Sequence, residues 1–132
     1  MNTVSKPLID IMKLNQERYG TTFDFDGALD KLKEELQEFI EASETQDEYG
    51  QVDALADIIV IAAGELVKLG YNPELTLKQT VKEITSRKQY PAQAKRWAIN
   101  DKQPGEKWLK NLDQPESTLY IANYSTCKLP SN

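Results

Sequence analysis

Four acidic side chains on two adjacent predicted helices are the residues of this chain best suited to chemistry. Glu35 and Glu38 stand three positions apart in the run EELQE, and Asp53 and Asp57 stand four positions apart in the run DALAD. Spacings of three and four place side chains on one face of a helix. Two such helices packed side by side would bring the carboxylates to one point.

Asp57 lies at the start of an apolar segment. The residues that follow it, IIVIAA, are apolar on every side of a helix, and such a helix is expected to be buried over most of its surface. An ionised carboxylate there destabilises the fold by several kcal/mol, roughly, unless a counter-charge compensates it. A divalent metal ion is such a counter-charge, and oxygen-only ligands suit Mg²⁺ or Mn²⁺ rather than Zn²⁺.

The residue inventory excludes several other chemistries. The chain has no histidine and one cysteine, Cys127. Zinc sites of the Cys/His type, histidine-dependent nucleophiles and the Glu-x-x-His ligands of di-iron bundles are therefore absent. Cys127 is expected to be a small, partly buried apolar residue. Carboxylate-bound Mg²⁺ remains, and its usual companion is a phosphate group.

The second predicted helix, taken alone, favours a simpler interpretation, in which its acidic residues are solvated. Its apolar residues form one stripe: Leu29, Leu32, Leu36, Phe39 and Ile40. Glu38 and Lys31 fall on the far side of that stripe, with Glu35 on its flank. Asp57 favours the metal site instead, because its own helix has no wide polar face to hold it.

These residues resemble the all-α nucleoside triphosphate pyrophosphohydrolases, often called MazG-like. Members of that family carry Glu-x-x-Glu on one helix and Glu-x-x-Asp on the next, and these side chains ligate Mg²⁺. Glu35, Glu38 and Asp57 match three of those positions, while Ala54 stands where the family has Glu. Asp53, one position earlier, or Glu34 remains as the fourth ligand.

The resemblance covers about residues 5 to 90, and the downstream sequence is similar to small phage-type members. It implies a four-helix all-α bundle and hydrolysis of a nucleoside triphosphate between the α and β phosphates, giving the monophosphate and pyrophosphate. The expected substrate is a deoxynucleotide, and the reaction would clean or shape the nucleotide pool. The phage-type tail favours shaping of the pool, with dGTP as the preferred substrate. Glu38 or Glu34 would act as general base on the attacking water.

Basic side chains are expected to hold the phosphates. Lys31 lies on the same side of its helix as Glu38 and can reach a phosphate held by the metal, although an ordinary surface ion pair is the alternative. Arg87 ends the fourth predicted helix, where the family has phosphate-binding bases, and it can bind bidentately. Lys107, in the run GEKWLK, offers a second basic cluster.

Base recognition is expected from the first helix if the family pattern holds. Asn15 carries a donor and an acceptor and could read the edge of a base, with Tyr19 or Phe23 stacking on it. The alternative for Asn15 is an ordinary polar surface residue.

Helix-ending residues predict four helices with short connections. The expected ranges are about 5–19, ended by Gly20; 26–43; a third that follows the polar stretch 44–50 and is ended by Gly70; and 73–87, begun by Asn72-Pro73. A short helix is expected at about 92–98. The tail, about 91–132, is irregular and carries aromatic residues that must pack on the helical core or on a neighbouring subunit.

Length and charge limit the remaining possibilities. A chain of 132 residues corresponds to one domain, 1–132. Its net charge of -5 argues against nucleic acid as a partner. Because no signal peptide or membrane span is visible, a cytoplasmic protein is expected, in the host cytoplasm if the protein is viral. The apolar third helix predicts a homo-oligomer, and the resemblance implies a dimer or tetramer.

Two other functions stay open. An Mg²⁺-dependent enzyme acting on phosphoribosyl-ATP would share the same ligands. Alternatively, the chain is a non-catalytic helical dimerisation module whose aromatic tail binds a partner. These classes differ at Asp57, because a metal ligand has no tolerated neutral replacement, whereas a module would fold as well or better with Asn there.

Overall fold

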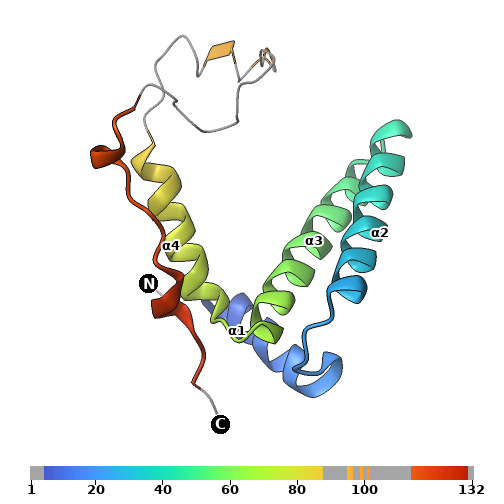
Figure 1. Ribbon diagram of the computed structural model, residues 1–132. Helices are drawn as coiled ribbons and strands as arrows, with labels where there is room; N and C mark the ends of the chain where they lie inside the picture. The colour runs from blue at the N-terminus through green and yellow to red at the C-terminus, as the bar shows by residue number, and fades with distance from the viewer. Residues whose placement is uncertain (1–4, 88–94, 97–98, 100, 102–113, 131–132) are drawn as a thin grey trace. The chain divides into compact units, whose positions relative to one another are not determined.

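The computed structural model describes residues 5–87, 95–96, 99, 101 and 114–130, and this part of the chain is all-α. Its α-helices are α1 (Ser5–Leu14), α2 (Phe25–Glu44), α3 (Glu48–Lys68) and α4 (Pro73–Ser86) (Figure 1). Shorter turns are the π-helical η1 (Asn15–Tyr19) and the 3₁₀-helical η2 (Glu116–Thr118) and η3 (Tyr124–Cys127). Among the described residues there is no strand, so the all-α prediction is confirmed.

The helix ends follow local chemistry. The carboxylate of Asp24 accepts a hydrogen bond from the Gly27 amide at the start of α2, and Asp47 caps α3 in the same way through Gly50. Gly70 ends α3 with a φ of 94°, a left-handed conformation that glycine adopts without strain. The first helix reaches Tyr19 as predicted, but its last five residues form the π-helical turn η1.

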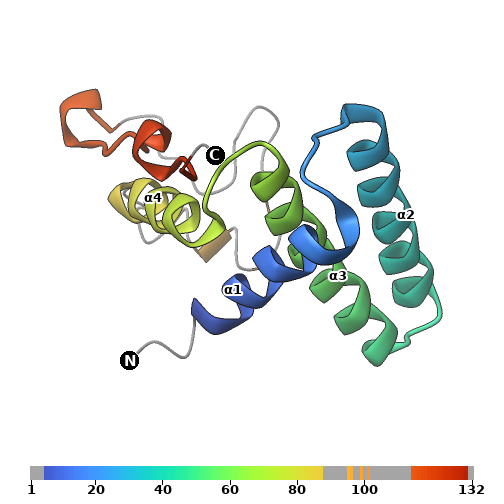
Figure 2. The ribbon, with the colours of Figure 1, turned by 90° about the horizontal axis from the view of Figure 1, so that it is seen from below.

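The chain divides into two compact units, which we describe separately. The first comprises the described residues up to Glu74 and those from Cys127 onward. In it α2 and α3 pair along their lengths, and α1 with η1 lies against α3 (Figure 2). Most buried apolar residues of the paired helices are alanines: Ala28, Ala42, Ala54 and Ala63. Small side chains let the helix backbones approach closely, which brings longer side chains on neighbouring turns within reach of one another.

Several large apolar side chains of the paired helices remain exposed. On α2 these include Leu36 and Ile40, at 52% and 40% exposure, and on α3 they include Leu55 and Ile59, at 47% and 61%. The expectation that the third helix is buried over most of its surface is therefore wrong for a single chain. The physical reason is that α1, η1 and α2 cover only part of α3.

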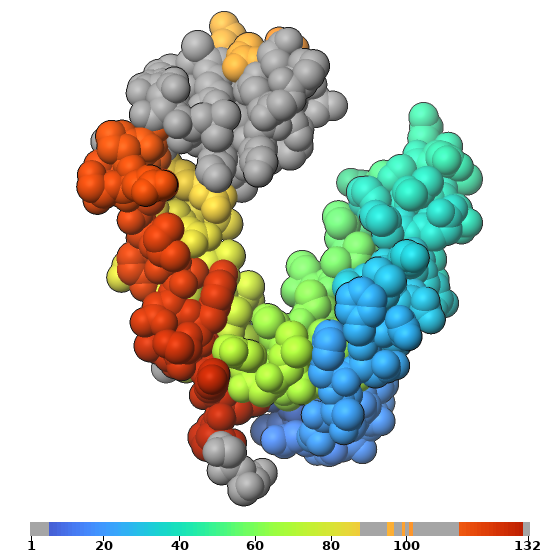
Figure 3. Space-filling model, viewed as in Figure 1, coloured from blue at the N-terminus to red at the C-terminus, as the bar shows by residue number. Residues whose placement is uncertain are grey.

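The second unit comprises the described residues from Leu75 to Thr126, in which residues 114–126 of the tail run along α4 (Figure 3). Side chains of α4 accept hydrogen bonds from the tail backbone: the Ala122 amide donates to Glu83 and the Asn123 amide to Gln79, each at 3.0 Å. Lys82 lies over the ring of Tyr120, with Nζ 4.2 Å from its centre. The tail backbone is thus held by side chains rather than by a regular ladder.

Two predictions fall wholly or partly outside the described residues. Of the short helix expected at about 92–98, only 95–96 are described, and these are helical. Lys107 lies outside the described residues altogether. Within the described part of the chain, no helix combines the length and apolar character that a membrane span requires.

Candidate metal centre

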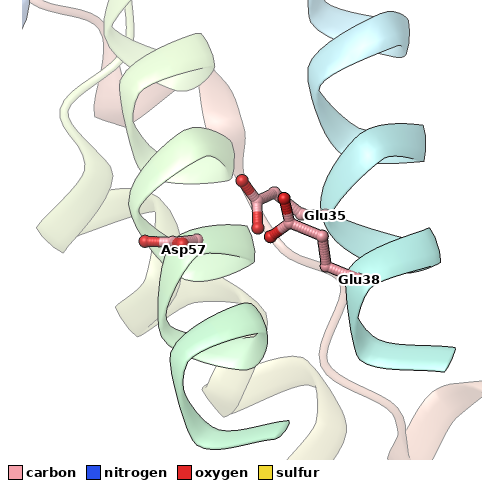
Figure 4. Close-up of side chains that lie close together, drawn as sticks. All are labelled: Glu35, Glu38 and Asp57. Atoms are coloured by element: carbon pink, nitrogen blue, oxygen red, sulfur yellow. The ribbon is translucent and has the colours of Figure 1, made fainter. Parts of the chain in front are cut away.

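Three of the predicted acidic residues converge between α2 and α3. Glu35 and Glu38 extend from α2 toward Asp57 on α3 (Figure 4), and each of the three offers an oxygen within 4.8 Å of the other two. Glu35 and Asp57 are half-buried, and Glu38 is exposed. The acidic face of α2 is therefore turned toward α3, whereas the apolar stripe had indicated a solvent-facing Glu38.

The charges in this group oppose one another. Burial raises the pKa of the Glu35 carboxyl from 4.5 to about 7, aided by a hydrogen bond shared with Glu38 and by the negative charges of Glu38, Asp57 and Glu34. Oxygen Oε2 of Glu35 is buried and has no hydrogen-bond partner among the described residues. An unpaired buried carboxylate oxygen is costly, and a cation would satisfy it.

The donor set fits a hard divalent cation. All three donors are carboxylates, which Mg²⁺ and Mn²⁺ prefer, and the group contains no softer nitrogen or sulfur ligand. A metal site whose negative charge is not offset by a cation is expected to have three features that this group has: closely spaced acids, a raised pKa and an unpaired carboxylate oxygen. The acidic cluster can thus hold a metal ion.

The other predicted acids lie outside this group. Asp53 is exposed and, with Glu38, lines a separate acidic hollow of about 300 Å³ at the α2–α3 turn. Glu34 is exposed and acts on the site through its charge. Ala54, which stands where the family has Glu, is 1% exposed. This position therefore serves helix packing in this chain.

A cavity of about 280 Å³ adjoins the carboxylates and is walled by the end of α1, by η1 and by α2 and α3. Glu35 and Asp57 line it, as do Asn15 and Tyr19 from η1. Leu14, Val60 and Ile61 give the wall apolar surface, and three further charged residues also line it: Lys31, Glu65 and Lys68. A concavity that combines apolar surface with converging polar groups is typical of small-molecule sites. Phe23, the alternative stacking residue, does not line it.

Lys31 lines this cavity and forms part of an ion cluster that the sequence analysis missed. Its Nζ lies 3.6 Å from Glu65 Oε1, and Lys68 Nζ lies 3.4 Å from the same oxygen. The Lys31 side chain is 46% exposed, while that of Lys68 is only 8% exposed. Glu65 and Lys68 follow Asp57 at helical spacings of eight and eleven, a signal that could have placed them beside the cavity.

Asn15 is a cavity residue rather than an ordinary surface residue. It is 4% exposed, and its Nδ2 donates to the carbonyl of Ile11 at 2.9 Å. Arg87 belongs to the second unit, where its guanidinium donates to Glu83 at 3.3 Å. The structure thus brings Asn15 and Lys31 to the cavity of the first unit.

Fold and site together define an all-α protein with a group of three carboxylates that could bind a metal ion, beside a ligand-sized cavity. A family model described as phosphoribosyl-ATP pyrophosphohydrolase matches residues 8–88, more than half of the chain. The chain belongs to this family, which is part of the MazG-like all-α superfamily of nucleotide pyrophosphohydrolases, and the predicted resemblance is confirmed. No curated protein and no solved structure matched the chain.

Proposed function

We propose that this chain hydrolyses a nucleoside triphosphate, preferentially a deoxynucleotide, between its α and β phosphates, releasing the monophosphate and pyrophosphate. The observation that carries the proposal is the convergence of Glu35, Glu38 and Asp57 beside a cavity of about 280 Å³, which Glu35 and Asp57 line. Membership of a pyrophosphohydrolase family supports the same reaction. The resemblance of the tail to phage-type members favours dGTP as substrate.

The three carboxylates would hold Mg²⁺, which Mn²⁺ can replace, with Asp53 or Glu34 as the fourth ligand. When bound, the cation neutralises phosphate charge and lowers the pKa of the attacking water. Glu38 or Glu34 takes the proton from that water, since both are exposed enough to exchange it with solvent. No side chain needs to form a covalent bond with the substrate.

Positive side chains would complete the phosphate site. Lys31 is half-exposed and paired with Glu65 at 3.6 Å, so it can turn to a phosphate while Lys68 continues to neutralise Glu65. A triphosphate carries more negative charge than the Glu65 carboxylate, so this exchange of partners by Lys31 favours binding of the nucleotide. Arg87 and Lys107 remain proposed as additional phosphate-binding residues.

The wall of the cavity is suited to a nucleoside. Tyr19 offers an aromatic ring, and Val60 and Ile61 offer apolar surface for a base. Asn15 supplies a polar group that can read the base edge.

The direct test is pyrophosphate release from the eight common ribo- and deoxynucleoside triphosphates in the presence of Mg²⁺. We expect pyrophosphate and monophosphate in equal amounts, no orthophosphate, and loss of the reaction in EDTA. Undiminished hydrolysis in EDTA, or release of orthophosphate from intact triphosphate, would overturn the proposal.

Phosphoribosyl-ATP is a second candidate substrate, favoured by the description of the matching family. It carries the same triphosphate, so the same acidic group would serve. Including it in the assay separates the two substrates, because turnover of phosphoribosyl-ATP alone would assign the narrower activity.

We also propose that the chain works as a homo-oligomer, a dimer or tetramer. Leu36, Ile40, Leu55 and Ile59 expose large apolar surfaces in the single chain. Burying such side chains against a second copy stabilises an assembly by about 25 cal/mol per Å² of apolar surface removed from water.

A further inference from the structure

The amide of Asn15 is fixed in the cavity wall with one end already engaged. Its partner is the Ile11 carbonyl, which can only accept, so Nδ2 must face it and Oδ1 must point away. Oδ1 has no hydrogen-bond partner among the described residues, although the residue is 4% exposed and lines the cavity. Asn15 therefore offers Oδ1 to a ligand as a hydrogen-bond acceptor.

Gly64 on α3 provides the space that this amide occupies. A Cβ atom at Gly64 would stand 2.7 Å from Asn15 Nδ2 and 3.0 Å from its Oδ1, closer than carbon and these atoms normally approach. A helix is less stable with glycine than with alanine at an interior position, so the presence of glycine in α3 needs a local explanation. The close approach of the Asn15 amide is that reason, because any larger residue would push the amide aside.

The location of this contact matters for recognition. Gly64 lies seven residues beyond Asp57, roughly 10 Å along the helix axis, and both line the same cavity. A nucleotide whose phosphates are held at the carboxylates carries its base at its opposite end. The π-helical turn that bears Asn15 is a type of distortion often found at functional sites.

We propose that Gly64 is a positioning residue for base selectivity: it lets Asn15 hold its Oδ1 where it accepts a hydrogen bond from an N–H group of the nucleotide base. This inference rests on the proposed nucleotide substrate. It assigns to α3 a role in choosing the base in addition to its role in supplying Asp57.

The test compares Gly64→Ala, Asn15→Ala and the double variant. Binding of the four α,β-methylene deoxynucleoside triphosphates with Mg²⁺ is measured by calorimetry, and hydrolysis of the four natural deoxynucleotides is measured alongside. For the preferred base, each single variant should weaken binding and raise KM by roughly tenfold, as expected for one lost hydrogen bond, with kcat within about threefold of wild type. The other bases should be affected less.

The double variant separates positioning from other effects. With the amide absent, the added methyl has room, so Gly64→Ala in the Asn15→Ala background should change neither base selectivity nor KM. Ala62→Ser is the matched control, since it adds one atom to an exposed position of the same helix outside the cavity. It should behave as wild type. Thermal unfolding of each variant identifies any that fail to fold, and Asn15→Ala keeps the test open if Gly64→Ala does.

Any of three results in the variants would overturn the inference: unchanged base ratios in both single variants, additive losses in the double variant, or an equal loss for all four bases. Absence of analogue binding in the wild type would also overturn it. The proposed function is judged separately by hydrolysis. Selective binding of the analogues without hydrolysis would reject the proposed function but keep the inference about Gly64. Hydrolysis with unchanged base ratios in the variants would keep the proposed function but reject the inference.

Discussion

Glu35 of α2 and Asp57 of α3 come together where the two helices pair, and with Glu38 they place carboxylate oxygens within 4.8 Å of one another. Burial and mutual repulsion raise the pKa of Glu35 to about 7. A divalent cation relieves both effects. Loss of one carboxylate charge should therefore weaken metal binding while leaving the fold intact.

Replacing Glu38 with Gln or Asp57 with Asn should abolish turnover and Mn²⁺ binding, because each change removes a ligand charge but keeps the side-chain volume. Pyrophosphate release and Mn²⁺ titration by electron paramagnetic resonance measure the two effects, with circular dichroism to check helix content. Glu41→Gln is the matched control, an exposed acid on α2 outside the cluster. If Asp57→Asn binds Mn²⁺ normally and only folds better, the helical module becomes the correct interpretation.

Asp53 should give a graded response. It is exposed and outside the group of three oxygens, so a role in the metal centre would run through water. We expect Asp53→Asn to weaken Mg²⁺ dependence and slow turnover by about 10- to 100-fold, the range for groups that act through a bound ligand. Rate against Mg²⁺ concentration measures this. Complete loss of turnover in Asp53→Asn would show that Asp53 is a direct metal ligand. No effect on turnover would indicate that Glu34 or solvent is the fourth ligand.

The stability of the metal-free protein should fall as pH rises from 4.5 to about 7. The pKa of Glu35 is about 7 in the fold and 4.5 without its environment, so between these values the folded state binds more protons than the unfolded state. The contribution is fully present below pH 4.5 and lost as pH passes 7. Denaturation in EDTA at several pH values should show this slope in wild type and a weaker one in Glu35→Gln. Parallel profiles would contradict the assignment.

Substitutions of Lys68 and Lys31 should have different effects, the first on the stability of the fold and the second on binding of the triphosphate. Lys68 is 8% exposed and neutralises the largely buried Glu65, so Lys68→Met should lower the free energy of unfolding by about 1–2 kcal/mol. Combining it with Glu65→Gln should recover most of that loss. Lys31 is half-exposed, so Lys31→Met should leave stability within about 0.5 kcal/mol and raise the KM for triphosphate. Equal destabilisation by both lysine variants would argue against a phosphate role for Lys31.

The apolar surface of α3 should mediate self-association. Ile59 is 61% exposed, and a charge there would oppose burial against a second copy. Light scattering at micromolar concentration should give at least a dimer for wild type and a smaller species for Ile59→Lys. Val81→Lys on α4, at a similarly exposed position, is the comparison. A fully active monomeric wild type would refute the oligomer.

Helix ends were predictable because the determinants are local. Gly70 ends α3 with a positive φ, and the side chain of Asn72 accepts from the Glu74 amide at the start of α4. The faces that meet were harder to predict. The stripe containing Leu36 indicated that Glu38 turns away from the core, yet Leu36 is exposed and Glu38 approaches α3. An apolar stripe does not reveal whether its partner is the same chain.

The candidate site was predictable to the extent that it follows helical spacing. The pairing of Glu35, Glu38 and Asp57 arises from regular periods on two helices, and Glu65 continues the same period. The approach of Asn15 to Gly64 has no such signal, because it depends on how η1 crosses α3. Contacts between residues distant in sequence require the packed helices to be known.

The way the tail is held along α4 has a consequence for its evolution. Backbone amides of Ala122 and Asn123 donate to Glu83 and Gln79, and every amino acid except proline supplies such an amide. Substitutions at these two tail positions, other than to proline, therefore keep the hydrogen bonds to α4. Substitutions at Glu83 and Gln79 do not keep them, because these bonds are accepted by the side chains of the two residues. Mutational tolerance in the tail is set by the helix beside it.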